Sequence, residues 1–142
     1  MVDVSKKDIT HRTAKASALI QLPNEIKNLV EHGEIESKKG PVLTTAIIAG
    51  TQAVKKTHDL IPFCHPLSIN SCDISIDFND ESNLVVTCTV GIDAKTGVEM
   101  EALTGVSVAS LTIYDMCKSI SHEIVISDIQ LLEKTGGKSD IS

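Results

Sequence analysis

The sequence predicts an α+β sandwich in which an antiparallel sheet carries helices on one face. Residues 13–22 alternate small or apolar side chains with polar ones, which is typical of a strand. Residues 71–79 and 83–92 show a similar alternation on either side of the turn sequence NDES, as expected of a hairpin. A long helix is expected over residues 98–120, followed by a last strand at 123–132. With helices in the first crossover, this order is the ferredoxin-like βαββαβ plan with one extra helix.

The first strand is expected to bury every second residue. Those positions hold small or apolar side chains, namely Ala14, Ala16, Ala18, Ile20 and Leu22. A helix is expected to follow Pro23, because Ile26, Leu29 and Val30 share one helical face before Gly33 ends it.

A second helix is expected over residues 42–60, after a loop at 38–41. Small residues recur along it at steps of three and four, which permits close packing on another element. They are Ala46, Ala49, Gly50 and Ala53. We expect this stripe to contribute to buried interfaces in a hexamer. In the hairpin that follows, Ile74, Ile76 and Phe78 are expected to point inward.

The composition indicates a single globular domain over residues 1–142, with mobile ends at 1–12 and 134–142. Hydrophobic residues make up 42% of the chain, and no apolar run approaches the roughly 20 residues of a membrane helix. The first residues are charged and lack the apolar core of a secretory signal. The four cysteines fall at irregular spacings, which fits a reduced, cytoplasmic protein better than a disulfide scaffold or a zinc site.

The charge and the aromatic content argue against a nucleic-acid partner. The formal net charge is −6, and the chain has one Tyr, two Phe and no Trp on which bases could stack. Pairs of lysines still stand out, and each pair either lies on a solvated surface or gathers with the others in one pocket. These pairs are Lys38–Lys39, Lys55–Lys56 and Lys134 with Lys138.

An acid and a base stand three residues apart near the end of the long helix. Asp115 and Lys118 are neighbours on one helix face at this spacing. The pair could be an ordinary ion pair on the helix surface without a functional role. However, Asp115 stands in an apolar stretch beside Met116 and Cys117, which would push the carboxyl towards its neutral form while the ammonium opposes this. Such a balance suits a tunable acid.

Two glutamates stand at the beginning of the same helix. Glu99 and Glu101 could simply favour the positive end of the helix dipole. Glu101 and Asp115 are 14 residues apart, which corresponds to about 21 Å along a helix axis. One small substrate cannot touch both within one chain. Either the glutamates are structural, or the sites are assembled from two chains.

His65 lies in the sequence DLIPFCHPLS, between Pro62 and Pro66, which fix the backbone. It could be a metal ligand, a general acid/base or a phosphate contact. The usual ligand spacings are missing around it, so we expect no metal site. Two rival functions remain open at this point. One is a metal-dependent nucleotide hydrolase that uses His58, Asp59, Cys64 and His65, and the other is a non-catalytic nucleotide-binding module.

Four segments carry a resemblance to a known family. They are MVDVSKKDITHR, KKGPVLTTAIIAGTQAVKKTHDLIPFCHPL, KTGVEMEALTGVSVASLTIYDMCK and LLEKTGGKS. Together they resemble molybdenum cofactor biosynthesis protein C, the family of cyclic pyranopterin monophosphate synthases. The resemblance implies a ferredoxin-like lyase that converts 3′,8-cyclo-7,8-dihydro-GTP into cyclic pyranopterin monophosphate, with acid/base catalysis and release of pyrophosphate. It also implies a homohexamer, a trimer of dimers with active sites at subunit interfaces.

The resemblance assigns roles through the motifs. Lys39 and Lys118 match the family's catalytic lysines, and Asp115 matches its acid/base aspartate. His65 matches the histidine of CHPL, for which we expect acid/base or anion-contact work. The implied substrate-binding set is Arg12, Cys64, His65, Glu99, Met100, Glu101, Lys134 and Lys138. No cofactor is expected, although Mg²⁺ could accompany the substrate's triphosphate.

Two further expectations concern the ends of the chain and the sharing of sites. The tail reads GGKSDIS where members of the family often have GGKSGDF, which makes the contact of Lys138 less certain than that of Lys134. We also expect Lys39 to come from one subunit, and Asp115 with Lys118 from its neighbour, so that all three face one pocket.

Overall fold

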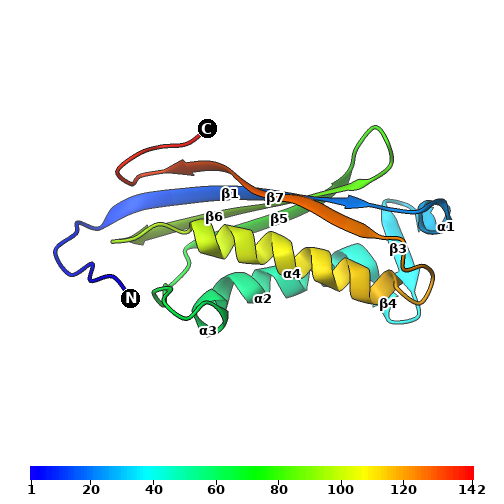
Figure 1. Cartoon of the computed structure of the whole chain (residues 1–142), viewed down its shortest axis with the longest axis horizontal. Helices are drawn as coiled ribbons and strands as arrows, with labels where there is room; N and C mark the ends of the chain where they lie inside the picture. The colour runs from blue at the N-terminus through cyan, green and yellow to red at the C-terminus, as the bar shows by residue number, and fades with distance from the viewer.

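The computed structural model describes residues 1–142 as a four-stranded antiparallel sheet with two long helices on one face (Figure 1). The sheet order is β5-β6-β1-β7. Its strands are β1 (Thr10–Gln21), β5 (Ser71–Phe78), β6 (Leu84–Ala94) and β7 (Val125–Thr135). The covering helices are α2 (Val42–Lys55) and α4 (Glu99–Cys117). The predicted α+β architecture is confirmed, and this strand order is compatible with a ferredoxin-like fold.

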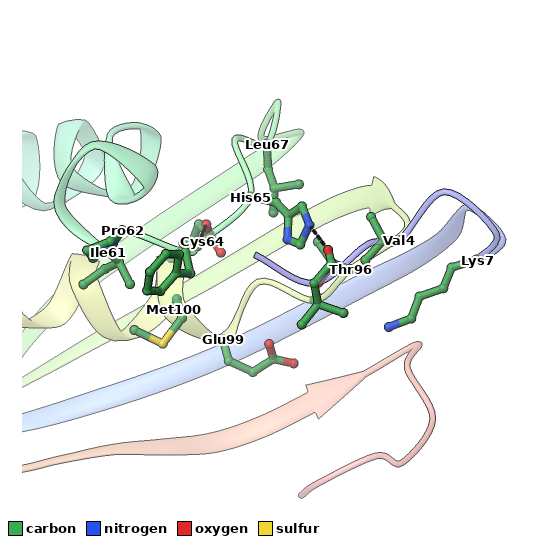
Figure 2. A pocket seen from close by; sticks show the side chains of 14 residues that line it. Val4, Lys7, Ile61, Pro62, Cys64, His65, Leu67, Thr96, Glu99 and Met100 are labelled. Carbon is green, nitrogen blue, oxygen red and sulfur yellow. Dashed lines mark hydrogen bonds between the residues drawn. The ribbon is translucent and has the colours of Figure 1, made fainter.

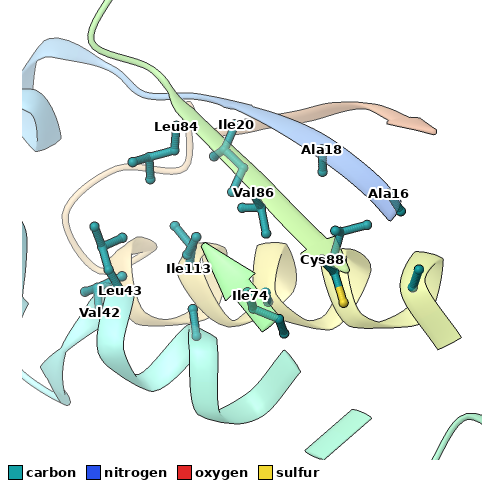
Figure 3. Packing of buried hydrophobic residues seen from close by; sticks show 14 of the residues in the cluster. Ala16, Ala18, Ile20, Val42, Leu43, Ile74, Leu84, Val86, Cys88 and Ile113 are labelled. Carbon is teal, nitrogen blue, oxygen red and sulfur yellow. The ribbon is translucent and has the colours of Figure 1, made fainter. Parts of the chain in front are cut away.

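The alternation in β1 determines which of its side chains enter the core. Ala14, Ala16, Ala18 and Ile20 are all buried, and the register places Ala16 opposite Cys88 of β6. Three of these four residues are alanines, whose short side chains project little from the sheet. A helix can therefore pack closely on the centre of the sheet. The core side chains between the sheet and the helices are shown in Figure 3.

Two glycines mark the place where α2 and α4 lie against each other. A Cβ atom at Gly50 would lie 2.6 Å from Ile74 Cδ1 and 2.9 Å from the carbonyl oxygen of Gly105. A Cβ atom at Gly105 would lie 2.8 Å from both Cys88 Sγ and Val54 Cγ2. The small residues of α2 therefore serve packing within the chain. These contacts lie within one chain, so our expectation that the stripe also contributes to interfaces between subunits stays a prediction.

The segment after β1 differs from the prediction. Helix α1 (Asn24–Lys27) is a single turn, and a small sheet follows it with strands β2 (Val30–Glu31), β3 (Glu34–Ser37) and β4 (Gly40–Pro41). His32 and Gly33 have φ values of 52° and 73° and connect β2 to β3. Two successive residues with positive φ are typical of a tight hairpin turn, which explains why the predicted helix does not continue to Gly33.

Other helix and strand boundaries also differ from the prediction. Helix α2 ends at Lys55, and a separate turn, α3 (Thr57–Leu60), follows it. Strand β7 continues to Thr135, and Lys134 exchanges backbone hydrogen bonds with Ile141. Arg12 and Lys134 therefore lie in paired strands, and the mobility expected of residues 1–12 and 134–142 stays a prediction. None of the helices has the length and the apolar character needed to cross a membrane.

Replacing Gly50 by alanine tests the close approach of α2 and α4. Alanine alone favours a helix over glycine by about 1 kcal/mol, so a substitution without clash would stabilise the chain. We expect Gly50→Ala instead to lower the free energy of unfolding by about 1–3 kcal/mol, the usual cost of overpacking. Urea unfolding followed by circular dichroism measures it. A gain in stability would show that the two helices have room to separate.

Candidate functional site

The predicted site residues gather at the two ends of α4. Lys39, Asp115 and Lys118 lie at its C-terminal end, and we call them the Lys39 cluster. The other predicted residues lie around its N-terminal end, where two adjoining pockets open. At 1.5 Å per residue, the 14 residues from Glu101 to Asp115 separate these ends by about 21 Å.

The Lys39 cluster is formed within one chain. Lys39 Nζ lies 2.7 Å from Asp115 Oδ2, and Lys118 Nζ lies 3.2 Å from Asp115 Oδ1. Lys39 comes from the turn between β3 and β4, whereas the other two residues come from the end of α4. The expectation that Lys39 and Asp115 come from different subunits is therefore wrong, because the β3–β4 hairpin brings Lys39 to α4 of its own chain.

Asp115 is a carboxylate in the unliganded chain. The hydrogen bond from Lys39, followed by the one from Lys118, lowers the pKa of Asp115 below its usual value. Its apolar sequence neighbours do not enclose it, since Met116 and Cys117 are buried in the core while Asp115 is exposed. Successive helix residues point about 100° apart, so neighbours in sequence are not neighbours in space. The apolar environment predicted for Asp115 is therefore not found.

The first pocket at the other end of α4 has a volume of about 460 Å³ and is partly apolar (Figure 2). We call it the Glu101 pocket. Helix α4 contributes Glu99, Met100 and Glu101, and the segment after α3 contributes Cys64 and His65. The remaining lining residues come from the N-terminal segment, from the segment after α3 and from the loop before α4, and are Val2, Val4, Lys7, Ile61, Pro62, Phe63, Leu67, Thr96 and Gly97.

Glu101 is the buried polar group of this pocket. The residue is only 2% exposed, and Oε1 has no hydrogen-bond partner. The thiol of Cys64 donates to Oε2 over 3.6 Å. Burial raises the pKa of Glu101, and burial together with the charge of Glu101 raises the pKa of Cys64 to about 11. An unpaired buried carboxyl oxygen costs free energy, so this atom is suited to a ligand that brings a hydrogen-bonding group.

His65 is held by the N-terminal segment of the chain. Its Nε2 lies 2.7 Å from the carbonyl oxygen of Val2, to which the ring N–H donates (Figure 2). The same segment is fixed by Lys95, whose ammonium group donates to the carbonyl oxygen of Ser5 over 3.2 Å. His65 thus lines the Glu101 pocket in one defined orientation.

The second pocket adjoins the first and is rich in cations. Its volume is about 500 Å³, and it shares Lys7, Thr96, Gly97 and Glu99 with the Glu101 pocket. We call it the basic pocket, because its lining includes Lys6, Lys7, Arg12, Lys134 and Lys138. Only Asp8 and Glu99 bring negative charge to it. Such a surface suits an anionic ligand with several oxygen atoms.

Two side chains of the basic pocket are already oriented. Arg12 Nε donates to the carbonyl oxygen of Ala94 over 3.3 Å, and Lys134 Nζ lies 3.6 Å from Glu99 Oε1. Lys6 and Lys7 were not among the predicted site residues. The signal that could have found them is the doubled lysine of the segment VDVSKKD, directly before the strand that carries Arg12.

The rival hypothesis predicts a metal site formed by His58, Asp59, Cys64 and His65. No three His, Cys, Asp or Glu side chains lie close enough together to hold a metal ion. His58 lies 3.4 Å from Asp59, and Cys64 is engaged with Glu101. The four residues proposed for a metal-dependent hydrolase do not form a common ligand set.

Comparison with known proteins supplies the family. The sequence model of the MoaC family matches residues 1–137. The chain is 52% identical over 141 residues to the cyclic pyranopterin monophosphate synthase of Xanthomonas axonopodis pv. citri, covering 99% of this chain and 86% of that protein. It is 52% identical over 139 residues to the protein of the same name from Brevibacillus brevis, covering 98% of this chain and 86% of that one.

A longer relative has a further part. The molybdenum cofactor biosynthesis bifunctional protein of Synechocystis sp. is 58% identical over 146 residues, which cover 100% of this chain but only 42% of that protein. The similarity nevertheless runs over nearly the whole of the present chain in each comparison. The chain therefore belongs to the MoaC family.

Proposed function

We propose that this protein is a cyclic pyranopterin monophosphate synthase, a lyase of molybdenum cofactor biosynthesis. It converts 3′,8-cyclo-7,8-dihydro-GTP into cyclic pyranopterin monophosphate and releases pyrophosphate. One observation carries the proposal beyond family membership: a basic pocket adjoins a pocket with a buried, unpaired carboxyl oxygen. The substrate combines a triphosphate with a purine-derived ring, which are the two kinds of group that these pockets suit.

The triphosphate is assigned to the basic pocket. Lysine and arginine side chains make charge-assisted hydrogen bonds to phosphate oxygens, and arginine can do so with two N–H groups at once. Arg12, Lys134 and Lys138 belong to the predicted substrate-binding set, and Lys6 and Lys7 add two further cations. When phosphate oxygens bind, Lys134 can exchange its contact with Glu99 for a stronger one.

The ring is assigned to the Glu101 pocket. A guanine-derived ring presents N–H groups and a carbonyl oxygen on its edge, and Glu101 Oε1 has no partner of its own. Met100 and Phe63 supply apolar surface on which the ring can lie. Burial raises the pKa of Glu101, and a carboxyl group that holds its proton more readily suits proton exchange with the ring.

The Lys39 cluster is assigned to proton transfer. Opening the five-membered ring and closing the pyrano ring require several protons to move, hence a set of acids and bases. Lys39 and Lys118 are donors on either side of the Asp115 carboxylate. This arrangement lets a proton leave one ammonium group while the carboxylate and the second ammonium keep the local charge balanced.

Formation of the cyclic phosphate is the step that releases pyrophosphate. A substrate hydroxyl oxygen bonds to the α-phosphorus, the bond from that phosphorus to the pyrophosphate oxygen breaks, and a base takes the hydroxyl proton. Cations of the basic pocket stabilise the charge that develops on the leaving pyrophosphate. His65 contributes either by accepting the proton or by contacting the phosphate.

A complete site is proposed to require two subunits. Within one chain, about 21 Å separate the Lys39 cluster from the Glu101 pocket, which is more than one substrate can span. We propose a homohexamer, a trimer of dimers, in which the Lys39 cluster of one subunit faces the Glu101 pocket of another. The protein is further proposed to act in the cytoplasm without a resident cofactor, although Mg²⁺ could accompany the triphosphate.

A direct assay tests the function. Purified protein is incubated with 3′,8-cyclo-7,8-dihydro-GTP, and pyrophosphate and cyclic pterin product are measured. We expect both in equal amounts. Binding of GTP analogues without any pyrophosphate would instead support a non-catalytic binding module.

Mixing inactive variants tests the shared site. We expect Lys39→Ala, Lys118→Ala and Glu101→Gln each to lower kcat by at least about a hundredfold, the usual scale for a general acid or base. Mixed hexamers of Lys39→Ala and Glu101→Gln should regain activity, because some interfaces combine an intact Lys39 cluster with an intact Glu101 pocket.

The matched control for this mixing is the pair Lys39→Ala with Lys118→Ala. Both changes damage the same cluster in their own chains, so no interface can hold an intact one, and activity should stay low. Mass spectrometry of the native oligomers verifies that subunits exchange. Recovery in the control mixture, or none in the first mixture, would contradict the proposed division of the site.

The protonation of Asp115 can be measured without substrate. Its lowered folded pKa means that the carboxylate's interaction with the lysines is complete above the usual value of 3.8 and is lost as pH falls through the lower folded value. In Lys39→Met we expect the pKa of Asp115 to rise towards its usual value, as a carbon-detected NMR titration would show. Lys38→Met, which changes the adjacent exposed lysine, should leave this pKa as it is.

Replacing His65 distinguishes its proposed role from that of a metal ligand. We expect His65→Ala to lower turnover by about a hundredfold. Circular dichroism and the metal content by elemental analysis should match those of the unchanged protein. If the variant loses about one tightly bound metal ion per chain, the metal-dependent hydrolase becomes the better explanation.

A further inference from the structure

We propose that Glu34 is the positioning residue for Lys39, and that it acts by fastening the β3–β4 hairpin to the beginning of α2. The inference rests on the proposed function, in which Lys39 moves protons. Glu34 contacts neither Lys39 nor Asp115 through its side chain. Its effect is on the backbone from which Lys39 extends.

The Glu34 carboxylate accepts four hydrogen bonds. Oε1 accepts from the backbone N–H groups of Ile35 (2.8 Å) and Leu43 (2.7 Å). Oε2 accepts from the backbone N–H and the hydroxyl of Thr44, at 3.0 and 2.9 Å. Burial raises the pKa of Glu34, but these four bonds outweigh it and hold the pKa below its usual value. The charged side chain thus links β3 to the first turn of α2 by hydrogen bonds.

The side chain of Glu34 caps helix α2, which has no capping side chain at its own N-terminus. Its N-cap residue is Pro41, which makes no side-chain capping hydrogen bond. The first N–H groups of a helix have no partner inside the helix, and an acceptor from a side chain normally satisfies them. Glu34 supplies that acceptor from eight residues before Val42, the first residue of the helix, and its negative charge meets the positive end of the helix dipole.

The hydrogen bonds of Glu34 to the start of α2 close a short loop that carries Lys39. Residues 35–42 lie between the two ends joined by Glu34, and Lys39 lies in the turn of the hairpin. Inside the loop, the backbone N–H of Lys39 donates to Ser37 Oγ over 3.2 Å, and the Ser37 hydroxyl donates to the carbonyl oxygen of Gly40 over 3.0 Å. Gly40 has a φ of 112°, which a residue with a side chain rarely adopts.

The hairpin could not hold its place by pairing alone. Strands β3 and β4 share two residue pairs, and β2 and β3 share two more. Burial of Ile35 in the core fixes strand β3. The chain after β4 is fixed where Glu34 accepts hydrogen bonds from Leu43 and Thr44. Lysine side chains are long and flexible, so the 2.7 Å contact of Lys39 with Asp115 requires a fixed backbone.

Kinetics of Glu34 variants test the proposal. We expect Glu34→Ala to lower kcat at least tenfold while KM changes less than about twofold, since substrate binding belongs to the other end of α4. Glu36→Gln is the matched control: Glu36 lies in the same strand, is exposed and makes no side-chain hydrogen bond, so kcat should not change.

A double-mutant cycle separates positioning from general damage. In a Lys39→Ala background, Glu34→Ala should cost no further activity, because there is no lysine left to position. If the two losses multiply, Glu34 does not act through Lys39 and the proposal fails. Should Glu34→Ala not fold, Glu34→Gln decides by the same comparison, since it keeps the shape but turns an N–H group towards one of the backbone donors.

A second measurement does not depend on activity. Loss of the Lys39 contact should raise the pKa of Asp115 in the NMR titration of Glu34→Ala, as it does in Lys39→Met. An unchanged pKa of Asp115 would overturn the positioning role. If the unchanged protein releases no pyrophosphate, the proposed function fails, but the titration still shows whether Glu34 places Lys39.

Discussion

The close packing of α4 on α2 and on the alanine-rich centre of the sheet is the constraint on which the rest depends. Gly50 and Gly105 allow the two helices to touch, and side chains of β1 and β6 leave room for both. Packing at this density fixes where α4, with its 19 residues, lies against α2 and the sheet. The helix therefore sets a fixed distance between the two groups of polar residues at its ends.

The two ends of α4 give their carboxyl groups opposite properties. Burial raises the pKa of Glu101, whereas two ammonium groups lower the pKa of Asp115. Environments that push the pKa values of two acids apart assign them different tasks in proton transfer. Glu101 is therefore the acid that holds a proton more readily, whereas Asp115 is the one that stays charged more readily.

Much of the fold could be predicted because its signals are local. The alternation in β1, β5 and β6 and the long helix α4 are visible in short windows of sequence. The segment from Asn24 to Pro41 could not be predicted in the same way. Its helix signal, Ile26 with Leu29 and Val30, competes with the turn at His32 and Gly33, and the positive φ values show that the turn prevails. The carboxylate that caps α2 comes from Glu34, seven residues before Pro41, so no cap sequence precedes the helix.

By itself, the sequence determined the α+β class, the inward face of the first strand, the motifs that carry the candidate site, and the spacing that keeps Glu101 and Asp115 apart. These follow from periodicity and helix rise, which are properties of the backbone. Only the tertiary structure decided that Lys39 meets Asp115 in the same chain, that Glu101 rather than Asp115 is the buried acid, and that Lys6 and Lys7 join Arg12. Burial and charge pairing depend on which distant segments meet, and that is settled by packing of the whole chain.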